Sequence, residues 1–243
     1  MLGSFKKLLG TAPHAAADWR ELSDWAAAQG WRFKRAKDAA GFVVDGAFDR
    51  QPWRLEWGPP QRDFIGAQEL RMRIELGLPP DLQMLLMSRL LMEQLDQRTY
   101  EQSVEGTQTR IDATIPEEVR WLVLFRPVDL TPFRVVRAHF GAVASIPEAG
   151  FTWIEGALAH GLERAVGSFL KLDPPFLLMT HRGKAYLRMA APEVDAPMLE
   201  QVVALFGVAV GQALRAAQGR GTGGEWPSSG STAWQSISGE DSR

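Results

Sequence analysis

The residue types that could carry out chemistry are few in this chain, and no two of its histidines lie close in sequence. Its 243 residues include four histidines and no cysteine. The absence of cysteine excludes disulfides, thiolate metal sites and cysteine nucleophiles. The sequence also contains no Walker A loop, HExxH helix, EF-hand loop or G-x-S-x-G elbow, each of which places reactive groups at a fixed spacing. We therefore expect neither a cofactor nor a bound metal.

Two histidines have charged neighbours at a spacing that matters for binding. His160 and Glu163 lie three residues apart and would share a helix face, where they could provide two metal ligands. Because no other recognisable ligand pair accompanies them, we interpret them as a surface pair. His181 stands beside Arg182 and Lys184. This grouping could bind phosphate or act as a base, although a polar turn is the simpler interpretation.

An enzyme whose site is assembled from dispersed residues is the alternative that this sequence leaves open. Active sites often leave no linear motif, because the fold brings distant residues together. The ionisable residues that such a site would use are His139, His160, His181, Asp112, Glu117 and Arg120.

The most basic stretch, residues 31–37, reads WRFKRAK and interleaves aromatic rings with cations. Platforms for single-stranded nucleic acid combine these residue types. In a strand, however, Trp31 and Phe33 would face the side opposite Arg32 and Lys34, which predicts an apolar core below and solvated charges above. The formal net charge of −2 also lacks the cationic excess typical of nucleic-acid or membrane binding. We therefore expect no nucleic-acid partner; one would require Arg32, Lys34, Arg35 and Lys37.

Two glycine patterns occur near the C-terminal end. Gly219, Gly221 and Gly224 form a literal G-x-G-x-x-G, but the dinucleotide motif needs a strand before it, and here a helix is predicted before it. Gly207 and Gly211 lie four residues apart in the most apolar helix. Small residues at this spacing allow a second helix to approach closely. They predict tight internal packing, with a dimer seam as the alternative.

Residues 219–243 are rich in Gly and Ser and show no hydrophobic periodicity, which predicts a disordered tail. Trp226 and Trp234 are unusual in such a segment. Apolar side chains outside a core can bind a partner protein. The candidate interaction residues are therefore Trp226, Trp234, Gly207 and Gly211.

The elements that would position these residues begin with a helix over residues 14–29, which Gly30 ends. Residues 31–76 then alternate apolar and charged side chains, which predicts an antiparallel meander with one packed face and one wet face. A helix follows from residue 81 to about residue 100 on the stripe of leucines and methionines. The residues predicted to face the core of the meander are Trp53, Leu55, Trp57, Leu70, Met72, Ile74 and Leu76.

The second half repeats the mixture. We expect strands at 121–125 and 133–143, a helix over 151–172, a hairpin of 176–179 and 185–189 around Arg182-Gly183, and a final helix from Asp195 to about residue 218. Runs of strands joined by tight turns favour an α+β fold with an antiparallel sheet over alternating β-α-β units. We expect a flexible N-terminus over 1–13 and a single domain over 14–218, with 14–110 and 111–218 as the halves that a pseudo-repeat would relate.

The resemblance to other proteins rests on three stretches of the sequence: PWRLEWGPPQRDFIGAQELRMR, DLQMLLMSRLLMEQL and EEVRWLVLF. With them the chain resembles conserved hypothetical proteins of proteobacteria over most of residues 15–218. An excess of Arg over Lys, with abundant Ala and Gly, is typical of a bacterial genome rich in G and C. The resemblance implies no known activity, cofactor or partner, and no functional residue is carried over.

The sequence favours a bacterial cytoplasmic protein. Residues 1–10 contain two lysines but lack the apolar region and cleavage site of a secretory signal. The strongest apolar run, 202–211, is half the ~20 residues that cross a bilayer. We predict a non-catalytic protein-interaction or scaffold module that binds a protein partner or itself, and no membrane. A closed polar pocket would instead favour the enzyme, whereas an exposed apolar patch would favour the interaction module.

Overall fold

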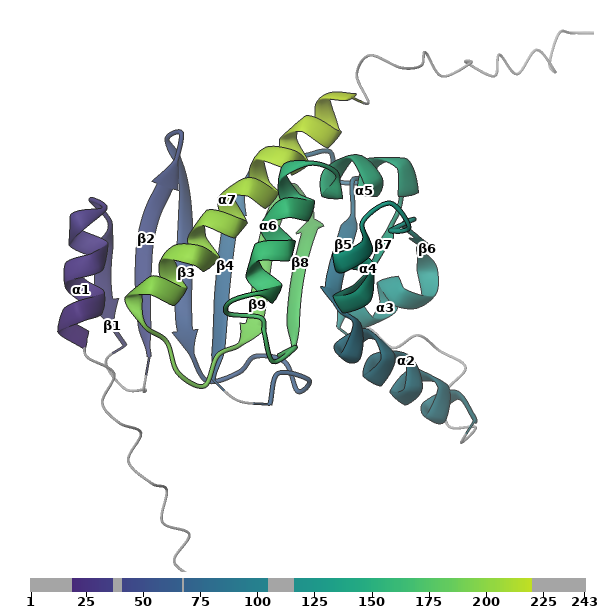
Figure 1. Cartoon of the computed structure of the whole chain (residues 1–243), viewed down its shortest axis with the longest axis horizontal. Helices are drawn as coiled ribbons and strands as arrows, with labels where there is room; N and C mark the ends of the chain where they lie inside the picture. Colours follow the sequence, from purple (N-terminus) through teal and green to yellow (C-terminus); the bar gives the residue numbers. More distant parts are fainter. Residues whose placement is uncertain (1–18, 37–40, 67, 105–115, 220–243) are drawn as a thin grey trace, which may run out of the picture.

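The structure, a computed structural model, describes residues 19–36, 41–66, 68–104 and 116–219. Within these ranges nine strands form one antiparallel sheet in the order β1-β2-β3-β4-β9-β8-β5-β7-β6. Helices α1 to α7 pack around it (Figure 1). The predicted α+β class with an antiparallel sheet is confirmed. The segments predicted as a flexible N-terminus and a disordered tail lie outside the described residues.

The predicted meander is present as β1 (Arg32–Arg35), β2 (Phe42–Phe48), β3 (Gln51–Gly58) and β4 (Glu69–Glu75), each paired with the next. The residues that face the core of the meander are the predicted ones. One side of these strands is exposed to solvent, so apolar and charged residues alternate visibly along the sequence. Trp53, Leu55, Trp57, Leu70, Met72 and Ile74 are buried, and Leu76 is half-buried against the core.

The predicted hairpin is formed by β8 (Phe176–His181) and β9 (Lys184–Ala190). Arg182 and Gly183 connect them with φ angles of 48° and 77°. Two successive residues in the left-handed region match the twist of the flanking strands. Strand β9 also pairs with β4, so the hairpin joins the meander to the rest of the sheet.

The helix predicted from residue 81 to about residue 100 is wrong in its first part. Residues Met84–Ser88 form strand β5, and helix α2 (Arg89–Val104) begins only after it. Strand β5 lies between β8 and β7, and all five of its residues are buried. A strand covered on both faces reads as a continuous apolar run, which periodicity cannot distinguish from a buried helix.

The strand predicted at 121–125 is also wrong, because helix α3 covers Glu117–Leu124. Trp121 is buried, whereas Val123 and Leu124 are 62% and 59% exposed. The apolar run therefore mixes core and surface residues. The strand predicted at 133–143 divides into helix α4 (Arg134–His139) and strand β7 (Phe140–Ala144), and the short β6 (Arg126–Pro127) pairs with β7.

The long helix predicted over 151–172 is two helices, α5 (Pro147–Ile154) and α6 (Ala157–Val166). Gly156 separates them with a φ of 70°, a conformation that breaks a helix and that glycine adopts without strain. The first and last helices are α1 (Trp19–Ala28) and α7 (Ala196–Gly219). As predicted, Asp195 caps α7, because its Oδ1 accepts a hydrogen bond from the Met198 backbone N–H at 2.8 Å.

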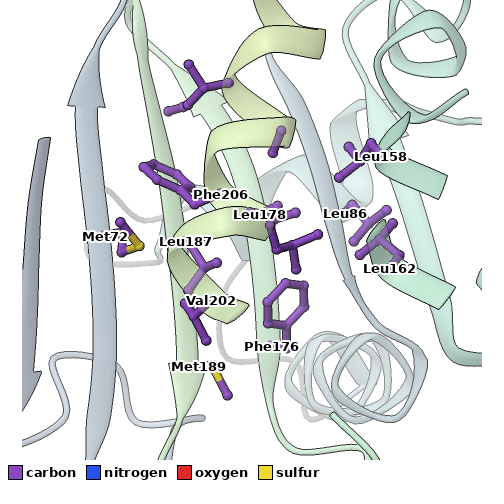
Figure 2. Packing of buried hydrophobic residues seen from close by; sticks show 14 of the residues in the cluster. Met72, Leu86, Leu158, Leu162, Phe176, Leu178, Leu187, Met189, Val202 and Phe206 are labelled. Atoms are coloured by element: carbon purple, nitrogen blue, oxygen red, sulfur yellow. The ribbon is translucent and has the colours of Figure 1, made fainter. Parts of the chain in front are cut away.

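Helices α6 and α7 lie across one face of the sheet (Figure 1). In Figure 2, Leu187 of β9 lies between Phe206 and Val202 of α7, and all three belong to the main core. Burying one side chain such as Phe206 contributes about 1.5–3 kcal/mol. By length and composition α7 could cross a membrane, but its apolar side packs on the sheet as the core helix of this fold.

On the opposite face of the sheet, described helices cover one part and leave another part without a helix. Over β5, β7 and β8 a second apolar cluster includes Leu85, Leu177 and Met179 and is covered by Leu91 and Leu95 of α2 and by Trp121 of α3. No described helix covers the same face of β3, β4 and β9. Strands from both proposed halves pair within the one sheet, as β4 does with β9; whether the halves are related repeats stays a prediction.

Candidate interaction site

Of the six ionisable residues predicted for a dispersed active site, the fold brings three together. Asp112 lies outside the described residues. His139 Nδ1 is 2.8 Å from Asp173 Oδ1, and His160 pairs with Glu163 at 3.4 Å on the surface, as the sequence interpretation expected. The three that converge are Glu117, Arg120 and His181.

His181 lies at the end of β8, against the first turns of α3. Its Nε2 is 3.9 Å from Glu117 Oε1, and its ring meets Trp121 edge-on at 5.2 Å between centroids. Glu117 is also paired with Arg120 at 2.5 Å. Burial lowers the pKa of His181 and outweighs the opposing effect of Glu117. The neutral imidazole is a proton acceptor beside a carboxylate, and its contacts fix α3 against the β8–β9 hairpin.

A hollow of about 580 Å³ lies beside α3, and we call it the α2 groove. Helix α2 lines it with Arg89, Met92 and Asp96, which lie on one helix face. The remaining lining residues are Leu122 of α3, residues 127–131, Arg137 of α4 and residues 141–143 of β7. At the base, a Cβ on Gly141 would lie 2.2 Å from Met92 Sδ, so a larger residue there would require the Met92 side chain to shift.

The α2 groove has an apolar floor and a charged rim. Arg89 donates from Nη2 to the Phe140 carbonyl at 2.9 Å, which fixes the start of α2 on the start of β7. Asp96 also lines it, and burial raises the pKa of this carboxyl. Large apolar side chains neighbour the lining residues in sequence and are open to solvent: Leu90 is 52% exposed, Val123 62% and Leu124 59%.

We call the outward residues of β1–β4 and β9 the open sheet face, on which the connection after β3 covers Glu69 through Gln61. Buried Glu69 is its central carboxylate: it accepts hydrogen bonds from Arg188 at 2.6 Å, Arg71 at 3.2 Å and the Gln61 N–H at 2.6 Å. Arg71 also bonds Glu56 at 3.3 Å. The wet sides of these strands thus carry ion pairs whose partners the strand register selects.

The candidate interaction residues of the final helix have different surroundings. A Cβ on Gly207 would lie 3.4 Å from the Phe48 ring, so this glycine seats α7 against the end of β2. Gly211 is exposed, with no atom within 4 Å of a Cβ placed on it. Trp226 and Trp234 lie outside the described residues. A dimer seam along α7 stays a prediction.

The basic stretch at β1 is arranged as strand alternation predicted. Phe33 and Trp31 pack against the main core, and Trp31 meets Trp53 at 4.8 Å between centroids. Arg32 pairs with Asp45 at 3.4 Å on the other side. Arg35 lies over the Trp19 ring at 5.5 Å, and Lys37 is outside the described residues. These rings are thus engaged in packing.

Comparisons with known proteins give a fold likeness alone. No protein-family model matches the chain, and no curated protein matches it. A similar solved structure is that of the mycobacterial trehalose monomycolate transport factor A, TtfA. It is 8% identical, with a TM-score of 0.46, and the match covers 82% of this chain and 94% of that one.

Proposed function

We propose that this chain is a non-catalytic protein-interaction module of the bacterial cytoplasm that holds an apolar segment of another protein in the α2 groove. The observation that supports this best is the combination of the apolar-floored groove with exposed Leu90, Val123 and Leu124. Exposed apolar side chains support an interaction module over an enzyme.

The α2 groove has the composition of a protein-binding surface. Such surfaces combine an apolar centre with a polar rim, and most of the affinity comes from a few apolar anchors. Met92, Leu122 and Leu130 provide the apolar centre, while Asp96 and Arg137 stand at the rim. Burying one large apolar side chain on binding is worth about 1.5–3 kcal/mol.

The occupant that fits is a short segment with one or two large apolar side chains and charges of both signs beside them. The volume of about 580 Å³ is within the ~300–1,000 Å³ of typical small binding sites. The rim carries both arginines and aspartates, so a segment with flanking charges of a single sign would meet repulsion on one side.

The test compares binding of a purified partner to three forms of the full chain. A partner is first identified by quantitative mass spectrometry and then titrated by calorimetry against wild type, Leu124→Asp and Leu172→Asp. Leu124 follows the lining residue Leu122 by two positions on α3, whereas Leu172 is 91% exposed and belongs to none of the lining segments, so Leu172 is the matched control. We expect Leu124→Asp to weaken binding at least tenfold and Leu172→Asp to leave it unchanged. Equal affinities for all three forms would contradict the proposal.

The enzyme alternative draws support from the convergence of Glu117, Arg120 and His181. It predicts a ligand-linked rise in melting temperature in a screen of nucleotides, metals and acyl or phosphoryl metabolites. A rise that is lost in His181→Ala would favour this alternative over the interaction module.

A further inference from the structure

The open sheet face carries more cations than carboxylates, although the whole chain has a formal net charge of −2. Strand alternation places seven cationic side chains and four carboxylates on it. The cations are Arg32, Lys34, Arg54, Arg71, Arg73, Lys184 and Arg188, and the carboxylates are Asp45, Glu56, Glu69 and Glu75. Grouped charge of one sign raises the local concentration of the opposite charge.

The register places arginines directly opposite one another in two rows. Arg54 of β3 stands opposite Arg73 of β4, and Arg71 of β4 stands opposite Arg188 of β9. Like charges in such positions destabilise a sheet. The row of Arg71 and Arg188 is compensated, because both bond buried Glu69.

In the row of Arg54 and Arg73, only the charge of Arg54 is balanced by a carboxylate. Arg54 Nε bonds Asp45 Oδ1 at 2.8 Å, whereas Arg73 is exposed and has no carboxylate within 4.0 Å in the described part of the chain. Neighbouring Glu75 is paired with Lys184. Two adjoining hollows, of about 100 and 600 Å³, share Arg54, Arg73 and Tyr186. Arg73, which forms no ion pair within 4.0 Å among the described residues, thus stands where the two hollows meet.

We propose that the open sheet face docks an acidic segment of a protein partner, with Arg73 as its main unpaired contact. This surface is separate from the α2 groove and does not depend on the function proposed for that groove. On β4, Arg71 and Arg73 are two residues apart, which is about 6.6 Å along a strand. An acidic side chain of an extended segment can therefore meet exposed Arg73, while Arg71, whose side chain is 15% exposed, stays paired with Glu56 and Glu69.

A protein partner fits this face better than a nucleic acid. Single strands bind to cations with several exposed aromatic rings beside them. The rings of β1 pack on the opposite side of the sheet, and Tyr186 is the one aromatic residue that both hollows share. Carboxylates also stand between the cations, as Glu56 does beside Arg71. A continuous row of phosphates would meet them, whereas separated carboxylate side chains can avoid them.

The experiment titrates the full chain with a short Glu-rich peptide and follows backbone amide shifts by NMR. A Gln-rich peptide of equal length, a single-stranded oligonucleotide and vesicles with anionic lipid are the comparison probes. Two charge reversals are compared with wild type: Arg73→Glu, and Arg98→Glu on the exposed side of α2 as the matched control. Thermal melting checks that each variant is folded.

We expect the Glu-rich peptide to shift amides of β3, β4 and β9, with an affinity that falls as salt is added. Arg73→Glu should weaken it roughly tenfold, and Arg98→Glu should not. Shifts elsewhere, equal binding of the Gln-rich peptide, or equal effects of the two reversals would overturn the proposal. Tighter binding of the oligonucleotide or the vesicles would overturn the choice of a protein partner. We expect Leu124→Asp, which should lose binding in the α2 groove, to bind the Glu-rich peptide as wild type does. Either proposal can therefore fail while the other holds.

Discussion

Arg62, in the connection between β3 and β4, donates from Nε to Oε1 of buried Glu118 at 2.6 Å. Glu118 belongs to the first turn of α3. The ion pair therefore joins the meander to the helix that provides Leu122 to the α2 groove. Glu118 is fully buried, whereas the Arg62 side chain is 29% exposed. The buried carboxylate therefore needs its partner more than the arginine does, because only the arginine can be solvated by water.

Removing the arginine should cost more than neutralising the acid. Arg62→Ala leaves a buried carboxylate without its cation, a situation that costs about 3–5 kcal/mol. Glu118→Gln keeps a polar group in place, and the partly exposed Arg62 can turn to water, so we expect a smaller loss. Urea unfolding at neutral pH measures both changes. A larger loss in Glu118→Gln would show that the pair does not hold α3 in this way.

His181 should make stability depend on pH between about 7 and 5. Burial lowers the pKa of its imidazole in the folded chain, with Arg182 and Arg120 acting in the same direction and Glu117 and Glu118 opposing. In the window between the folded pKa and the unfolded value of about 6.5, the unfolded chain binds more protons. Its contribution to stability is therefore present above the unfolded pKa and is lost as pH falls through that window.

The control for this pH effect is His181→Phe, which keeps an aromatic ring near Trp121 but cannot be protonated. Wild type should lose more unfolding free energy than the variant on acidification from pH 7 to pH 5, as measured by urea titrations at each pH. If wild type gained stability relative to the variant, the pair with Glu117 would dominate over burial.

Arg73→Glu should stabilise the isolated protein slightly. The substitution turns the opposed pair of Arg54 and Arg73 into an attractive one, worth roughly 0.2–1 kcal/mol across a sheet. Because the pair is exposed, the gain should shrink in high salt. Melting curves at low and high salt check this. A loss of stability that salt does not change would mean that Arg73 has a structural role.

Gly46→Ala should disturb the core of the meander. A Cβ at this position of β2 would lie 2.2 Å from Trp53 Cζ2, and overpacking of this kind typically costs about 1–3 kcal/mol. Gly66→Ala is the matched control, because nothing lies within 4 Å of its added Cβ. We expect urea unfolding to show the loss only in Gly46→Ala. Equal stability of the two variants would mean that Trp53 can move aside.

The parts of the fold that the sequence predicted correctly are those with one wet face. In β3 and β4 a charged residue follows each apolar one, so the period of 2 is visible from Trp53 to Ile74. Strand β5 has no wet face, and its run from Met84 to Ser88 carries no period. Helix α3 was predicted as a strand because exposed Val123 and Leu124 extend its apolar run and remove the helical period. Pro116 followed by Glu117 and Glu118 is a helix-start signal that would have identified it.

The α2 groove could not be predicted from the sequence, since its walls come from five separate segments, one of which contributes Arg137 of α4. Residues 89–96, Leu122, 127–131 and 141–143 meet only because β7 and β6 follow β5 at the edge of the sheet. That order is set by tertiary packing and not by local pattern. The convergence of Glu117 and His181 likewise depends on where α3 packs against the β8–β9 hairpin.

Hydrogen exchange of the full chain, alone and bound to its purified partner, tests the interaction-module account most directly. Protection that appears in Arg89–Val104, Glu117–Leu124 and residues 127–131, and that is absent when Leu124→Asp replaces wild type, is the predicted result. Protection confined to other elements, or the same protection in Leu124→Asp, would contradict the assignment of the α2 groove as the binding surface.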